Sequence, residues 1–177
     1  GKTDLVLTQG SSQNESVLLG TGTGSFPTLN QFTAGTDQLQ PYIADYDSDG
    51  INDVLVANGS TVNKLYVLLG NGNGQFISAS SLPVFTSAPQ SVTTADLNAD
   101  TKLDIITTNG RTNEIGVLLN NGVGSYQPPV YYSATGDPTS IATGDFNGDL
   151  KKDIATGNAT DNTISIFLGN GDGTLGQ

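Results

Sequence analysis

The sequence contains no histidine and no cysteine. The commonest general base of enzymes and their strongest nucleophile are therefore missing. Without cysteine there can be no disulfides, so the sequence does not indicate whether the protein works in an oxidising or a reducing compartment. The carboxylates that lie outside the acidic loops described below show no convergent spacing; they include Glu15, Asp37, Glu114, Asp137, Asp161 and Asp172. The sequence therefore predicts a protein that is not an enzyme.

Basic residues and long apolar runs are also scarce. Only six lysines and arginines are scattered over 177 residues, so no phosphate-binding stripe exists and nucleic acid is not an expected partner. No apolar run reaches the length that a membrane span requires. Charged residues make up only 13% of the chain, too few for a disordered protein. We expect a single folded domain over residues 1–177.

The acidic residues that are present are concentrated in three nine-residue stretches. These stretches, 45–53, 96–104 and 145–153, carry oxygen-bearing side chains at positions 1, 3, 5 and 9, and they begin 51 and then 49 residues apart. Ten of the 17 acidic residues lie in them, four in the first and three in each of the others. A net charge of −11 concentrated in this way indicates a set of cation ligands rather than a solubilising surface.

Calcium is the cation that such a loop fits best. Ca²⁺ takes six to eight oxygen ligands in irregular geometry, and a backbone carbonyl at position 7 adds one to the side chains. Gly50, at position 6 of the first stretch, suits the sharp, left-handed bend of such a loop. We expect about three Ca²⁺ sites, with these residues as ligands: Asp45, Asp47, Asp49, Ile51 and Asp53; Asp96, Asn98, Asp100, Lys102 and Asp104; Asp145, Asn147, Asp149, Lys151 and Asp153.

Two other interpretations of these stretches are weaker. Asp, Asn and Gly form turns without any metal, but turns alone do not require oxygen atoms at the same four positions three times. An EF-hand loop also opens with alternating acidic residues, but it needs glutamate at position 12 and a helix on either side. Position 12 is Val56, Thr107 or Thr156, and the flanking segments have the composition of strands.

The acidic stretches belong to a repeat of about 50 residues. Each repeat has short apolar runs separated by turns rich in glycine, such as Gly70–Gly74 and Gly169–Gly173, and no segment has a sustained helical period. The pattern predicts an all-β chain of four-stranded propeller blades. The expected repeats are 1–44, 45–95, 96–144 and 145–177, with the first and last incomplete, so the chain holds about three and a half blades. Asp4 matches Asp53, 49 residues later.

The combination of motifs resembles the FG-GAP/VCBS repeat family, which includes the integrin α-subunit propeller. The resemblance rests on Asp145–Asp149 with Asp153, and on the glycine turn Gly70–Gly74 that precedes Phe76. It covers essentially the whole chain and implies a partial seven-bladed propeller loaded with calcium. Two positions depart from the family pattern: Thr101 and Leu150 stand where the family has glycine, so the sites at Asp96 and Asp145 are expected to be weaker.

The expected function is an extracellular calcium-binding β-propeller module for adhesion or ligand binding, with calcium in a structural role. The extracellular location follows from the calcium concentration that low-affinity loops require. The partner is expected to be an extracellular protein or glycan. A carbohydrate-binding lectin is one alternative. A self-assembling structural or filament-forming repeat protein is another, with a homo-oligomer completing the propeller, because an incomplete blade exposes a strand edge.

Overall fold

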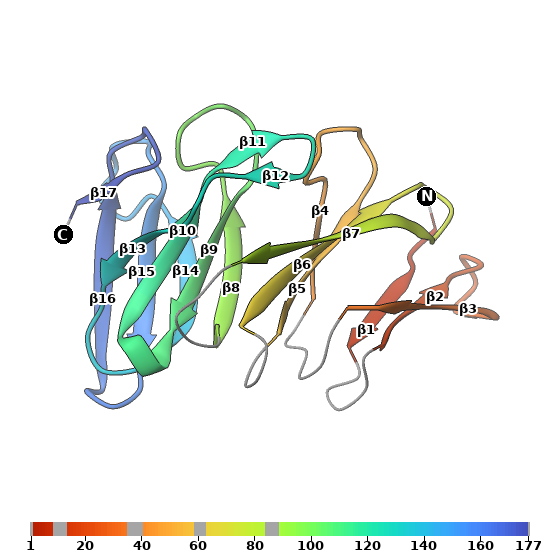
Figure 1. The fold of residues 1–177 in the computed structure, drawn as a ribbon, viewed down its shortest axis with the longest axis horizontal. Helices are drawn as coiled ribbons and strands as arrows, with labels where there is room; N and C mark the ends of the chain where they lie inside the picture. Colours follow the sequence, from red (N-terminus) through yellow and green to blue (C-terminus); the bar gives the residue numbers. More distant parts are fainter. Residues whose placement is uncertain (1, 9–13, 35–40, 59–62, 84–88, 177) are drawn as a thin grey trace.

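The computed structural model describes residues 2–8, 14–34, 41–58, 63–83 and 89–176. Within these ranges the regular secondary structure is almost entirely β-strand, and its only helical element is the short 3₁₀ turn η1 (Gly110–Thr112). The strands form successive antiparallel sheets that lie side by side along the long axis of the molecule (Figure 1). The all-β prediction is confirmed. Asp37, one of the carboxylates outside the acidic loops, lies outside the described residues.

The first two sheets contain three and four strands. Neighbouring strands are antiparallel, and in the second sheet they follow the order of the sequence from one edge to the other. The first sheet contains β1 (Leu5–Thr8), β2 (Asn14–Leu19) and β3 (Thr28–Thr33); the second contains β4 (Tyr42–Ala44), β5 (Asp53–Asn58), β6 (Lys64–Gly70) and β7 (Phe76–Pro83).

The next two sheets have four strands each, and a short hairpin projects from the third. The third sheet contains β8 (Ser91–Ala95), β9 (Asp104–Asn109), β10 (Glu114–Leu118) and β13 (Val130–Ser133); the hairpin contains β11 (Asn120–Gly122) and β12 (Ser125–Tyr126); the fourth sheet contains β14 (Pro138–Gly144), β15 (Asp153–Asn158), β16 (Thr163–Gly169) and β17 (Leu175–Gly176). Each four-stranded sheet is a propeller blade with its acidic loop between the first and second strands, as the sequence predicts.

Two details concern the outer strands of the last two repeats. In the third repeat, β12 ends at Tyr126 and β13 begins only at Val130, so residues 126–132 do not form one continuous strand. Pro128 and Pro129 lie between them, and proline has no N–H to donate to a ladder. The fourth repeat was expected to end before its outer strand, yet Leu175 and Gly176 pair with β16 as β17.

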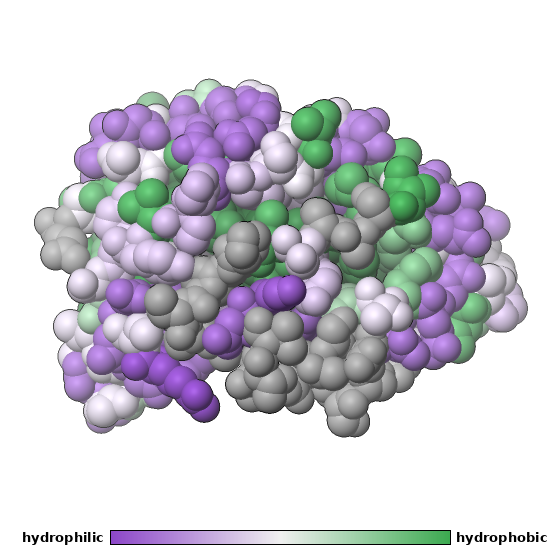
Figure 2. Space-filling model, viewed as in Figure 1, coloured by the Kyte–Doolittle hydropathy of each residue, from purple (hydrophilic) through white to green (hydrophobic). Residues whose placement is uncertain are grey.

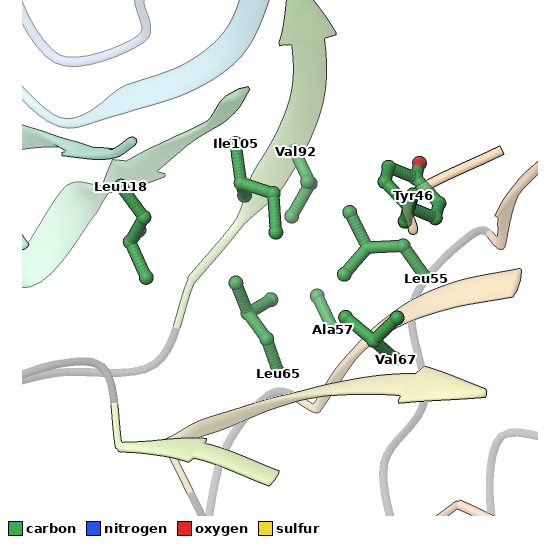
Figure 3. Close-up of a cluster of buried hydrophobic side chains, with 8 residues drawn as sticks. All are labelled: Tyr46, Leu55, Ala57, Leu65, Val67, Val92, Ile105 and Leu118. Atoms are coloured by element: carbon green, nitrogen blue, oxygen red, sulfur yellow. The ribbon is translucent and has the colours of Figure 1, made fainter. Parts of the chain in front are cut away.

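The hydrophobic core lies between the sheets. Along β5, Val54 and Val56 belong to a cluster that includes Val6 of the first sheet, whereas Leu55 and Ala57 belong to a cluster shared with the third sheet. Figure 3 shows side chains of β5 and β6 directed toward those of β8, β9 and β10. A central strand buried on both faces explains the continuous apolar run in its sequence. Each large side chain buried in this way contributes roughly 1.5–3 kcal/mol.

Polar residues cover most of the face shown in Figure 2, and apolar residues are visible between them. Among the described residues, none lies in a helix that is long and apolar enough to cross a membrane.

Candidate metal centre

The first acidic loop connects β4 to β5 and brings three carboxylates together. Asp45, Asp47 and Asp49 each place an oxygen within 4.8 Å of those of the other two. Three negative charges at this separation repel one another unless a cation lies among them. The structure therefore gathers positions 1, 3 and 5 of the first predicted site into one cluster.

Hydrogen bonds within the loop hold this cluster in place. Asp45 accepts from the backbone N–H groups of Asp49 (3.1 Å) and Gly50 (2.8 Å). Asp47 accepts from the N–H of Asp49 at 3.2 Å, and Asp49 accepts from the N–H of Ile51 at 2.7 Å. The loop backbone thus fixes the direction of each carboxylate.

The second loop repeats this network with an amide at position 3. Asp96 accepts from the N–H groups of Asp100 (3.1 Å) and Thr101 (2.8 Å). Asn98 accepts from the N–H of Asp100 at 3.2 Å. Asn98 therefore accepts the same hydrogen bond as Asp47, but the second loop has one negative charge fewer than the first.

The third loop has the same network. Asp145 accepts from the N–H groups of Gly148 (2.7 Å), Asp149 (3.2 Å) and Leu150 (2.9 Å), and Asn147 accepts from that of Asp149 (2.9 Å). These backbone bonds, led by that of Leu150, lower the pKa of the Asp145 carboxyl below its ordinary value. Three loops of different sequence thus adopt one conformation.

The loop backbone is left-handed at two positions. Position 6 has positive φ in all three loops: 86° at Gly50, 70° at Thr101 and 68° at Leu150. The predicted left-handed bend is therefore found, and it is strained at the two non-glycine residues. Position 4 is also left-handed, at Ser48 (65°), Ala99 (60°) and Gly148 (82°). The bend at position 4 was not predicted from the sequence, because only the third loop carries glycine there.

Position 7 separates the first loop from the other two. The N–H groups of Ile51, Lys102 and Lys151 donate to the position-5 carboxylates at 2.7–2.9 Å. That the carbonyl groups of these three residues bind a metal stays a prediction. Lys102 Nζ also lies 2.9 Å from Asp100 Oδ2, and Lys151 Nζ lies 3.9 Å from Asp149 Oδ2. The bond from Lys102 lowers the pKa of Asp100. The first loop has Ile51 at position 7, so the carboxylate of Asp49 has no ammonium partner there.

The position-9 carboxylates make a second set of hydrogen bonds, which closes each loop. Asp53, Asp104 and Asp153 are fully buried. Asp53 accepts from the N–H of Tyr46 through Oδ2 (2.7 Å) and from that of Gly70 through Oδ1 (2.8 Å). Burial raises the pKa of Asp53, while these two bonds oppose the rise. Asp53 thus closes the loop and ties it to the end of β6, and the structure does not bring it into the group formed by Asp45, Asp47 and Asp49.

The same closure recurs in the other repeats. Asp104 accepts from the N–H groups of Leu97 and Asn120, and Asp153 accepts from those of Phe146 and Gly169, at 2.8–2.9 Å. In the first repeat, the N–H of Gly20 donates to Asp4 Oδ1 at 2.8 Å. The predicted equivalence of Asp4 and Asp53 is confirmed.

Asn120 has a role that the sequence analysis missed. It takes the position in the third repeat that Gly70 holds in the second. A Cβ added to Gly70 would meet the carbonyl oxygen of Asn52. The side-chain Nδ2 of Asn120 donates to the carbonyls of Tyr46 (3.0 Å) and Leu103 (3.1 Å). Asn120 thereby links the third repeat to the first acidic loop. The signal available in the sequence was the exchange of a repeated glycine for asparagine.

The fold and the loops together define a class of protein, a β-propeller repeat protein with an acidic loop in each complete blade. The FG-GAP-like repeat family matches residues 1–56, 45–107 and 96–156, and the chain belongs to this family. Among curated proteins, no significant match is found.

Two solved structures are similar to this chain. One is a mutated Tc holotoxin pore of Photorhabdus luminescens, with a TM-score of 0.53 and 20% identity over 86% of this chain and 8% of that chain. The other is an Agrocybe aegerita lectin described as recognising non-reducing terminal N-acetylglucosamine, with a TM-score of 0.48 and 18% identity over 99% of this chain and 62% of that chain. The chain therefore spans only part of either structure, and at 20% identity the likeness to the holotoxin pore concerns the fold alone.

Proposed function

We propose that this chain is a calcium-stabilised β-propeller module of the extracellular space, which presents a surface to a protein or glycan partner. The observation that supports calcium most directly is the cluster of Asp45, Asp47 and Asp49. Its ligand atoms are hard oxygens, its members are held by the loop backbone, and no ammonium group stands at position 7. This donor set fits Ca²⁺, which prefers several carboxylate and carbonyl oxygens.

The role of calcium in this proposal is structural. The loop joins the first two strands of the blade, so a cation among its carboxylates removes their mutual repulsion and holds that connection. A ligand that binds only the folded state stabilises it by about 2.7 kcal/mol at a hundredfold excess over its Kd. Calcium at millimolar concentration, which is found outside cells, would supply such an excess to loops of moderate affinity.

Calcium titration of metal-free protein tests the proposal. We expect calorimetry to show binding to the wild type, and Asp47→Asn to weaken the tightest site by tenfold or more, because it removes one of the three clustered charges. The matched control is Glu114→Gln, which removes one negative charge at the start of β10, outside the loops. No binding at several millimolar calcium, or equal effects of the two substitutions, would disprove the site.

The glycan alternative is supported by a separate feature. A cavity of about 430 Å³ opens between the first two sheets. Its lining mixes hydrogen-bonding side chains with an aromatic one, as in many sites for small polar ligands, and includes Asp4, Asn52, Asn71, Gln75 and Phe76. A glycan array, probed with wild type and with Asn71→Ala, distinguishes this function: a lectin gives a defined set of bound glycans that the variant loses. Self-assembly, the third function that the sequence leaves open, depends on the outer faces of the first and fourth sheets rather than on the acidic loops.

A further inference from the structure

Every interface between neighbouring sheets uses the same two faces. We call the face that contacts the following sheet the forward face, and the face that contacts the preceding sheet the rear face. The forward face of the second sheet contributes Leu65 and Val67 of β6, which pack in one cluster with Ile105 on the rear face of the third sheet. The third sheet repeats the arrangement with Ile115 and Val117, which pack with Ile154.

The forward face of the fourth sheet has no neighbour among the described residues. Phe167 pairs with Ile154 in the same register in which Leu68 pairs with Val54. Ile164 and Ile166 therefore correspond to Leu65 and Val67. Whereas Leu65 and Val67 are fully buried, Ile164 is 72% exposed, Ile166 45% and Leu168 40%. An apolar strip that is core in two earlier repeats is thus open to solvent in the last one.

The rear face of the first sheet is open in the same way. Leu5 follows Asp4 as Val54 follows Asp53, and Val54 is buried. Leu5 is 40% exposed, Leu7 46% and Leu29 54%. The first sheet and the fourth sheet lie at opposite ends of the long axis (Figure 1). The molecule therefore exposes one forward face and one rear face, which are the two halves of the interface that it already forms three times.

A leucine and a glycine fit together at each internal interface. A Cβ added to Gly74 would collide with Leu19 of the preceding sheet, and one added to Gly173 would collide with Leu119. A Cβ on Gly124 would lie 3.4 Å from Leu69 Cδ2. Each forward-face leucine therefore packs onto the last glycine of the next repeat's turn, which has no side chain to exclude it.

The fourth and first sheets carry a leucine and a glycine that correspond to these pairs but do not contact each other. Leu168 is the forward-face leucine of the fourth repeat, and it is exposed. Gly24 is the corresponding turn glycine of the first repeat, with a φ of 83°, and a Cβ there would meet no atom of the described residues within 4 Å. A leucine without its glycine and a glycine without its leucine are thus presented at opposite ends of one molecule.

We propose that a second copy of this chain docks head to tail, with its rear face on the forward face of the first copy and Leu168 of one copy on Gly24 of the other. The partner follows from the interface itself, because the two free faces reproduce the apolar surfaces that pack within the chain. The contact is heterologous, so it closes into a ring if the rotation permits and otherwise forms an open chain. This proposal does not depend on calcium.

Sedimentation at several protein concentrations tests whether the chain associates. We expect the average mass of the wild type to rise with concentration, and Ile166→Lys to raise the dissociation constant by about tenfold or more, because it places a charge at the centre of the apolar strip. The matched control is Val123→Lys, at an exposed residue in the β11–β12 turn, which should associate as the wild type does. A wild type that stays monomeric, or an Ile166→Lys protein that associates equally well, overturns the proposal.

Cross-linking tests the orientation, and the absence of cysteine makes it simple. Leu5→Cys and Ile166→Cys are prepared separately and treated with a short bismaleimide, each alone and then mixed. Head-to-tail docking predicts a cross-linked dimer from the mixture and almost none from either variant alone. A dimer from one variant alone indicates a symmetric contact, and no dimer beyond that of a Leu5→Cys and Val123→Cys mixture indicates no such interface; either result contradicts the proposal.

Discussion

Lys102 Nζ lies 2.9 Å from Asp100 Oδ2, so the second acidic loop carries an ammonium group of its own beside the predicted cation ligands. Ile51 occupies the same position in the first loop, where three carboxylates cluster without such a partner. The three loops share one hydrogen-bond network, yet they differ in charge. Their dependence on an external cation should differ accordingly.

Replacing Lys102 with leucine should make the second loop more dependent on calcium. The substitution removes the ammonium that partly neutralises Asp100, so we expect tighter calcium binding and a small loss of stability without metal. Both groups are partly exposed, so that loss should be at most about 1 kcal/mol. Calcium titration and urea denaturation in a chelator measure the two effects. Unchanged affinity would show that the ion pair does not compete with the metal.

Glycine at position 6 should stabilise the third loop. Leu150 has a φ of 68° and an almost fully exposed side chain, so Leu150→Gly relieves left-handed strain and gives up little packing. We expect a gain of about 1 kcal/mol in the free energy of unfolding. Val130→Gly, at an exposed strand residue, is the control and should destabilise the protein. The prediction fails if Leu150→Gly lowers the melting temperature.

Asp53→Asn should destabilise the metal-free protein. The carboxylate accepts from the N–H groups of Tyr46 and Gly70, one through each oxygen. Asparagine offers one acceptor and one donor, so one buried N–H loses its partner, at a cost of about 1–3 kcal/mol.

Asp47→Asn provides the comparison for this substitution. It keeps an oxygen for the N–H of Asp49 and removes a repelling charge, so metal-free stability should change by less than about 0.5 kcal/mol. Urea midpoints in a chelator distinguish the two variants. Equal losses would contradict the separate roles of positions 3 and 9.

Glu15 should make stability fall as pH rises. It is fully buried on β2 with no hydrogen-bond partner for either carboxylate oxygen among the described residues, and burial raises its pKa from 4.5 to about 7. The protonated form therefore favours folding. That contribution is complete below about pH 4.5 and is lost as pH rises through 7, by about 3 kcal/mol.

Glu15→Leu tests this dependence. The equivalent residues of the next repeats are Leu65 and Ile115, which are buried in the core, so leucine suits the site. We expect the variant to be more stable than the wild type at pH 8 and the difference to shrink toward pH 4.5. Unfolding curves of metal-free protein across this range measure it. A difference that does not vary with pH would show that Glu15 does not titrate on unfolding.

The sequence by itself determined the repeat, its strands and the acidic loops. Alternating oxygen side chains and the bend at Gly50 are local features, because the side chains at positions 1, 3 and 5 bond to backbone groups within five residues. Asp4 could be matched to Asp53 for the same reason, since a repeat carries its own register along the chain.

Only the tertiary structure decided what depends on contacts between distant residues. It separated Asp53 from the cluster, because its second partner is Gly70, 17 residues later on another strand. It buried Glu15 at a place that leucine occupies in the next repeat. It also set Leu19 against Gly74, while Leu168 and Gly24 make no such leucine–glycine contact within the part of the chain that the structure describes. Packing between blades brings these residues together, and no spacing within one repeat encodes which surface the next blade will cover.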